Sequence, residues 1–156
     1  QPYNKITLMQ NQNNFPHIPS GRCLIANEQG EILMVRRSDT SNNNPGQWEL
    51  PGGKIEVDDH GFYAEEINQA IKREVREETD VKVAEMSEPL LVEAHSINDG
   101  PRKGGRSLTF VTRAQAYEGE GRVADAESSD LRWWPSGQLP SNVTQVSQLA
   151  IHRFFK

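Results

Sequence analysis

The stretch IKREVREETD, residues 71–80, constrains the fold more than any other part of the chain. It lies in a helical pattern that extends over residues 63–79. A helix turns by about 100° per residue, so residues three and four apart share one face. The apolar residues that share a face here are Ile67, Ala70, Ile71 and Val75. The pattern therefore predicts a helix that packs this stripe against the body of the protein.

Three glutamates, Glu74, Glu77 and Glu78, fall on or beside the apolar stripe rather than opposite it. Like charges at this spacing repel, and a helix C-terminus disfavours negative charge. Carboxylates turned toward the protein need partners, and a hard cation such as Mg²⁺ takes carboxylate oxygens together with water and phosphate. Arg73 can hold a glutamate from the flank. An arginine and lysine network without a metal is the alternative. The opposite, solvated face is expected to carry Glu65, Gln69, Lys72 and Arg76.

The rest of the chain predicts strands interleaved with two helices. A hairpin is expected from RCLIA and EILMVRR around the turn NEQG, followed by a polar loop at 38–46. The further strands are expected in WELPGG, VKVAEM, PLLVEAHSI, RSLTFVTRAQAYE and DLRWW, with a closing helix over residues 142–155. This order predicts an α/β or α+β domain in which helices cover a mixed sheet.

Composition limits the partners. The 156 residues carry a net charge of −5, so no general basic field is available for polymeric nucleic acid or an anionic membrane. No apolar run approaches the roughly 20 residues that cross a bilayer. The single cysteine, Cys23, is expected to be a small buried residue and fits a reducing compartment. A cytoplasmic location is the default expectation.

The region around REVREE resembles the Nudix box of the MutT-like hydrolases, which reads G-x5-E-x7-R-E-U-x-E-E-x-G-U with U a bulky aliphatic residue. The residues that match it are Gly53, Glu65, Arg73, Glu74, Val75, Glu77, Glu78 and Val81. WELPGGKIE and DLRWWPSGQLP also resemble segments of this family. The resemblance spans roughly residues 22–140.

Two departures from the box stand out. Eleven residues separate Gly53 from Glu65 instead of five, which indicates an insertion near residues 57–63. Asp80 stands where the family has a glycine after the helix. Asp tolerates a left-handed backbone better than most residues, so the helix is expected to end there.

The resemblance implies one Nudix domain over residues 1–156, with a polar segment at 1–20 and an α/β/α sandwich fold. It implies that Glu74, Glu77 and Glu78, with the carbonyl of Gly53, bind Mg²⁺ or Mn²⁺, and that Arg73 orients the glutamates. Glu74, Arg73 and Glu77 are the implied catalytic residues. The general base stays open between Glu74, Glu127 and Asp130, and a homodimer is usual for the family.

The implied activity is Mg²⁺-dependent cleavage of a phosphoanhydride bond in a small nucleotide, either a nucleoside triphosphate or another nucleoside-diphosphate derivative. The alternatives are hydrolysis of ADP-ribose, a dinucleotide or a nucleotide sugar, and a nucleotide-binding module without catalysis. Arg36 and Arg37 are candidates for substrate binding. Neighbours in a strand face opposite sides, so at most one of them can reach a given pocket.

Overall fold

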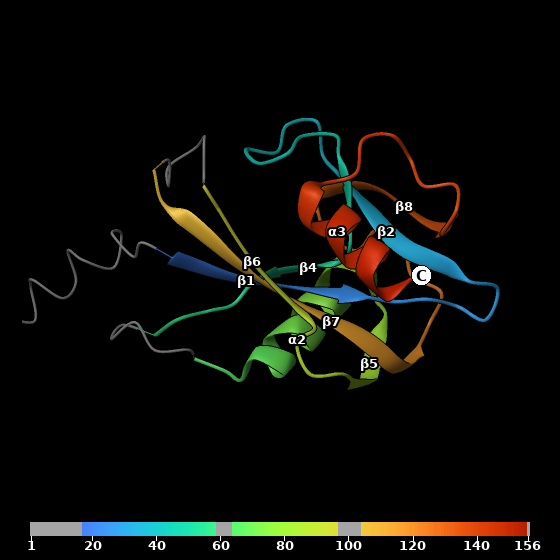
Figure 1. The fold of residues 1–156 in the computed structure, drawn as a ribbon, viewed down its shortest axis with the longest axis horizontal. Coiled ribbons are helices and arrows are strands. Elements are labelled where there is room, and N and C mark those ends of the chain that lie inside the picture. The colour runs from blue at the N-terminus through green and yellow to red at the C-terminus, as the bar shows by residue number, and fades with distance from the viewer. Residues whose placement is uncertain (1–16, 59–63, 97–103, 156) are drawn as a thin grey trace, which may run out of the picture.

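The computed structural model describes residues 17–58, 64–96 and 104–155 (Figure 1). Most of the polar segment expected at 1–20 and residues 59–63 of the expected insertion lie outside these ranges. Within them, none of the helices is long and apolar enough to cross a membrane.

A mixed five-stranded sheet forms one part of the protein, and its strands follow the order β4-β1-β7-β5, with β6 also paired to β7. β1 runs parallel to β7, whereas the other pairs are antiparallel. The strands are β1 (His17–Leu24), β4 (Gly52–Lys54), β5 (Lys82–Met86), β6 (Leu91–Ser96) and β7 (Arg106–Glu118). The long β7, predicted from its alternating sequence, pairs with β1, β5 and β6.

A smaller antiparallel sheet has three strands in the order β3-β2-β8. They are β2 (Glu31–Arg37), β3 (Trp48–Glu49) and β8 (Ser128–Pro135). The interior of β2 is buried, in keeping with its run of aliphatic residues. Both faces of this small sheet are therefore covered near its centre.

The expected hairpin between β1 and β2 forms only next to its turn. Asn27 N–H donates to the Glu31 carbonyl and Leu33 N–H donates to the Ile25 carbonyl, each at 3.0 Å. Beyond these contacts the two strands separate into different sheets. β1 pairs with β7 along its whole length, and β2 also pairs with β8 along its whole length. Each strand thereby gains a longer hydrogen-bonded ladder than the hairpin would give.

Two helices cover the strands on opposite sides, as Figure 1 shows. α2 (Ile67–Thr79) packs against β1, β4 and β5, and α3 (Gln145–Phe154) packs in a second apolar cluster that includes Leu24. Cys23, the neighbour of Leu24 on β1, belongs to the cluster under α2. Adjacent residues thus face different layers. The predicted fold class, an α/β/α sandwich around mixed sheet, is confirmed.

The predicted apolar stripe of α2 is also confirmed, because Ala70, Ile71 and Val75 are buried. The helix begins at Ile67 rather than near residue 63, since Glu66 has an extended backbone. It ends as expected at Asp80, whose φ of 60° is left-handed. α3 lies within the range predicted for the closing helix.

The burial of Cys23 gives a chemical prediction. Burial raises the pKa of its thiol to about 12. At pH 8 only about one thiol in ten thousand is then ionised, and the thiolate is the reactive form. We expect no reaction with a disulfide reagent in the folded protein and rapid reaction in guanidinium, measured by absorbance. Labelling of the folded protein at the rate of a free thiol would contradict this environment.

Candidate active site

The turn Pro51–Gly53 lies against the C-terminal half of α2. Gly52 pairs with Arg22 of β1 and has a φ of 154°, and a Cβ built on it would lie 2.0 Å from the Gly21 carbonyl oxygen. Only glycine allows this approach. The N–H of Gly52 donates to Glu78 Oε2 at 2.9 Å. The glycine turn therefore joins β1 and β4 directly to the helix that carries the carboxylates.

Glu78 is a buried carboxylate, with 6% of the residue exposed. Its other oxygen, Oε1, accepts a hydrogen bond from Ser128 Oγ at 3.1 Å. Burial raises the pKa of Glu78 to about 7, against the opposing effect of the Arg22 charge; Glu49 and Asp125 raise the pKa further. The donors to this carboxylate are thus neutral groups, and its negative charge is costly where it lies.

Glu74 lies half-buried beside Gly53. A Cβ on Gly53 would lie 2.3 Å from Glu74 Oε2, so the missing side chain leaves the space that this carboxylate occupies. Glu74 Oε1 accepts a hydrogen bond from Arg73 Nη1 at 2.9 Å. Burial raises the pKa of Glu74, and the contact with Arg73 opposes that rise. The Gly53 position and Glu74 are therefore in direct contact.

Arg73 holds three glutamates together. Its Nε and Nη2 donate to Glu65 Oε1 at 2.9 and 2.7 Å, and the same Nη1 that contacts Glu74 lies 3.2 Å from Glu77 Oε2. The hydrogen bonds to Glu65 raise the pKa of Arg73. The expectation that Glu65 lies on the solvated face was wrong, because Glu65 precedes the first turn of the helix and does not follow its periodicity.

The donor set fits a hard divalent cation in type, since its side-chain donors are carboxylate oxygens. Glu74 and Glu78 both lie against the Pro51–Gly53 turn, while the side chain of Glu77 is 59% exposed. Among the residues that the structure describes, no three Asp, Glu, His or Cys side chains already converge on one point. Arg73 instead contacts both Glu74 and Glu77. The donors to Glu78 are neutral and do not balance its negative charge, so a cation bound here would offset that charge.

A second charged group, which the sequence reasoning missed, lies on the same side of the small sheet as Glu78. Glu49 is buried, and its Oε1 forms ion pairs with Arg22 Nη1 and Arg37 Nη1, both at 3.0 Å. Arg37 also donates to the Asn43 carbonyl and to Ser41 Oγ, so it ties the 38–46 loop to this group. A charged residue inside the short apolar strand WEL was the available signal.

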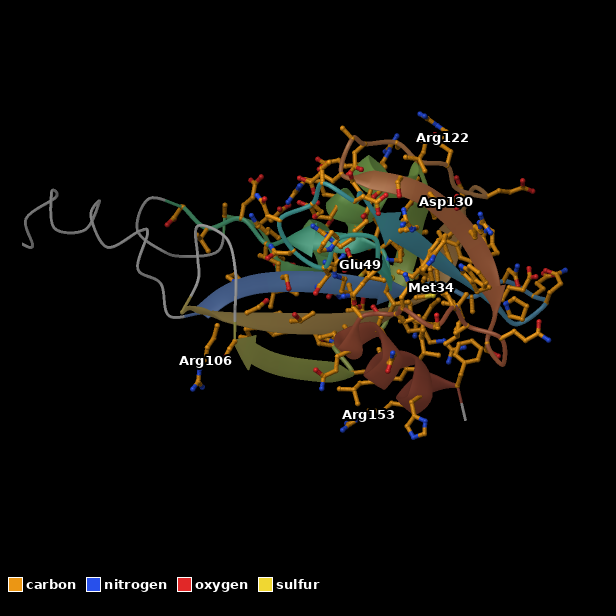
Figure 2. All side chains as sticks on the ribbon, turned by 90° about the horizontal axis from the view of Figure 1, so that it is seen from above. Met34, Glu49, Arg106, Arg122, Asp130 and Arg153 are labelled. Carbon is orange, nitrogen blue, oxygen red and sulfur yellow. The ribbon has the colours of Figure 1, made fainter. Side chains whose placement is uncertain are left out.

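Arg36 faces the other side of β2, as strand alternation predicts. It donates to Ser129 Oγ and Asp39 Oδ1, each at 2.9 Å, beside a cavity of about 410 Å³. The cavity is lined by Arg36, Trp48, Ser129, Asp130, Arg132 and Trp134. Asp130 therefore lies away from Glu78 and accepts a hydrogen bond from Arg132. Figure 2 labels Asp130 on β8 and Glu49 in the interior of the molecule.

Glu127 directly precedes Ser128, the partner of Glu78. Its side chain is exposed, its N–H donates to Asp125 Oδ1 at 3.2 Å and its carbonyl accepts from Ser38 N–H. Of the three candidates for the general base, Glu74 lies near Glu78 on the same helix, and Glu127 lies near it through Ser128. Asp130, the third, lies on the side of the Trp48 cavity. Asp125 was missed by the sequence reasoning, and only its place in a polar loop could have indicated it.

Comparison with known proteins identifies the family. The family model of the NUDIX domain matches residues 16–154 of this chain. The chain therefore belongs to the Nudix family, and it is a Nudix hydrolase.

Two relatives show the extent of the sequence similarity. A MutT-like protein of Streptomyces ambofaciens is 37% identical over 130 residues, which cover 83% of this chain and 71% of that protein. The 8-oxo-dGDP phosphatase NUDT18 of Homo sapiens is 29% identical over 117 residues, 73% of this chain and 31% of that protein. The chain thus spans about a third of the human relative.

Solved structures agree with the fold. The MutT NUDIX hydrolase from Burkholderia pseudomallei superposes with a TM-score of 0.74 at 25% identity, covering 88% of this chain and 98% of that one. The MutT protein from Methanosarcina mazei gives 0.72 at 25% identity, with 89% and 93% covered.

The two glycines of the turn predict different responses to the same substitution. Gly52→Ala places a Cβ against backbone that cannot swing away, so we expect a loss of unfolding free energy above about 2 kcal/mol. Gly53→Ala meets the end of a flexible side chain, Glu74, so we expect a loss below about 1 kcal/mol. Urea unfolding measures both. Equal losses would contradict this packing.

Proposed function

We propose that this chain is a Mg²⁺-dependent pyrophosphohydrolase that cleaves a phosphoanhydride bond in a nucleoside triphosphate or another nucleoside-diphosphate derivative. One observation carries the proposal: Glu74 and Glu78, from the end of the box, lie against the Pro51–Gly53 turn at its start, in a chain that the NUDIX domain matches over residues 16–154. A buried carboxylate whose hydrogen-bond donors are neutral groups fits a site that binds a metal ion.

Glu74, Glu77 and Glu78 would hold Mg²⁺ or Mn²⁺, and the Gly53 carbonyl would add a further oxygen ligand. When bound, the ion supplies positive charge against the phosphoanhydride oxygens and makes water a stronger nucleophile. Arg73 keeps Glu74 and Glu77 close together although both are negative, because one of its nitrogens contacts both. Glu65 anchors the other side of the same guanidinium.

Glu74 is the proposed general base. Its pKa is raised by burial, and a carboxylate with a raised pKa is a better proton acceptor at neutral pH. Its Oε1 is engaged by Arg73, so Oε2, beside Gly53, is the oxygen proposed to take the proton. Glu127 is the alternative base, since its side chain is exposed and it directly precedes Ser128 in the chain.

Arg37 is proposed to bind substrate oxygens, because it lies on the Glu78 side of the small sheet beside Arg22 and Glu49. Arg36 is a candidate only for a substrate group that reaches the cavity beside Trp48. A nucleoside triphosphate is the first choice of substrate. The human relative is named an 8-oxo-dGDP phosphatase, so an oxidised deoxyguanosine diphosphate is a further candidate substrate. The homodimer and the cytoplasmic location stay predictions.

Product analysis tests the activity. Purified protein with Mg²⁺ would be incubated with normal and oxidised nucleoside triphosphates, 8-oxo-dGDP, ADP-ribose, NADH, dinucleoside polyphosphates and nucleotide sugars. We expect one class to be converted to a monophosphate, measured by liquid chromatography and mass spectrometry, and EDTA to stop the reaction. Consumption of none of them, with a melting temperature that still rises with Mg²⁺, would indicate a binding module instead.

The proposed ligands give a second prediction. Glu77→Gln and Glu78→Gln each remove a negative oxygen ligand, so we expect turnover to fall about 100-fold or more while the fold survives. Glu85→Gln, an exposed change on β5, is the matched control and should keep the wild-type rate. Near wild-type turnover in Glu78→Gln with an unchanged melting temperature would remove Glu78 from the ligand set.

A further inference from the structure

Ser128 meets Glu78 across fifty positions of the chain, and both residues are buried. Its Oγ donates to Glu78 Oε1 at 3.1 Å, while Gly52 N–H donates to Oε2 at 2.9 Å. The first donor comes from β8 of the small sheet and the second from β4 of the large sheet. Each oxygen of the carboxylate is therefore fixed from a different side.

An irregularity in β8 gives Ser128 this orientation. Arg36 pairs with Asp130, but Arg37 pairs with Ser128, so Ser129 is an extra residue in the strand. In a regular strand Ser128 would share a side with Asp130, which faces the Trp48 cavity. A bulge of one residue reverses that alternation. Ser128 consequently points to the α2 side, together with its pair partner Arg37.

The loop before β8 is fastened to the end of α2. The N–H groups of Arg122 and Ala124 donate to the carbonyls of Thr79 and Glu78 at 2.9 and 3.1 Å. Asp125 Oδ1 then accepts a hydrogen bond from Ser128 N–H at 3.2 Å. The loop thus uses the free carbonyls of the helix end and sets the backbone of Ser128 at a fixed distance from Glu78.

We infer that Ser128 is a positioning residue, whose hydroxyl orients the Glu78 carboxylate to receive a divalent cation. The inference rests on the proposed function. A carboxylate oxygen has two lone pairs, so one hydrogen bond to each oxygen leaves capacity for an ion. The neutral hydroxyl restricts rotation of the carboxylate without cancelling its charge. Loss of such an outer contact lowers metal affinity by about 10-fold to 100-fold in known sites.

The test measures Mn²⁺ binding to the full chain without nucleotide, by electron paramagnetic resonance of the free ion. We expect Ser128→Ala to weaken binding about 10-fold or more and Ser128→Thr, which keeps the hydroxyl, to stay within about 3-fold of wild type. The matched control is Ser129→Ala. That hydroxyl accepts a hydrogen bond from Arg36 on the other side of the strand, so Mn²⁺ affinity should not change.

Melting temperatures in EDTA show whether each variant folds. If Ser128→Ala does not fold, Ser128→Cys takes its place, because it keeps the side-chain size and offers only a weak donor. The same loss of affinity is expected. In a Glu78→Gln background, Ser128→Ala should add no further loss, since a residue that acts through Glu78 has nothing left to orient. An additional loss there would assign Ser128 a different role.

The outcomes separate the two proposals. Wild-type Mn²⁺ affinity in a folded Ser128→Ala variant, with the wild-type enzyme still active, would overturn the positioning role alone. A wild-type protein that binds no Mn²⁺ and hydrolyses no nucleotide would overturn both the proposed function and the role of Ser128.

Discussion

The carboxylate of Glu78 is buried at the end of a helix whose dipole disfavours negative charge. The groups that donate hydrogen bonds to it, Gly52 N–H and Ser128 Oγ, are neutral. Burial of a carboxylate is costly, and here the charge of Arg22 offsets only part of that cost, since burial still raises the pKa of Glu78. The glycine turn reaches the carboxylate from one sheet and Ser128 reaches it from the other, so Glu78 links the two sheets. Arg73, in the middle of the same helix, contacts Glu74 and Glu77 on one side and Glu65, which precedes the helix, on the other.

The local pattern of α2 was sufficient to place two of its three predicted inward carboxylates, whereas the side chain of Glu77 is 59% exposed. A helix has a fixed period, so the apolar stripe located Glu74 and Glu78 beside the body of the protein, and both are partly or fully buried. The same pattern failed for Glu65, because periodicity says nothing about where the first turn begins. An extended Glu66 moved Glu65 off the helix and into the contact with Arg73.

The partners from other strands could not be predicted in this way. Ser128 faces Glu78 only because one extra residue interrupts the β8 ladder, and no residue type marks such a bulge. The expected hairpin failed for a related reason. Neighbouring strands were assumed to pair, whereas the parallel partner of β1 is β7, more than eighty positions later. Contacts of this range depend on the whole topology, and only Glu49 in its apolar strand gave a local signal.

The distance along the chain between α2 and β8 also has a consequence for synthesis. A chain is synthesised from its N-terminus to its C-terminus, so the helix with all its carboxylates is made well before Ser128. Until β8 takes its place beside β2, Glu78 lacks the hydroxyl that donates to its Oε1 in the finished fold. If that hydroxyl prepares the site, ion capture belongs to the finished domain rather than to the helix, and metal loading marks completion of the fold.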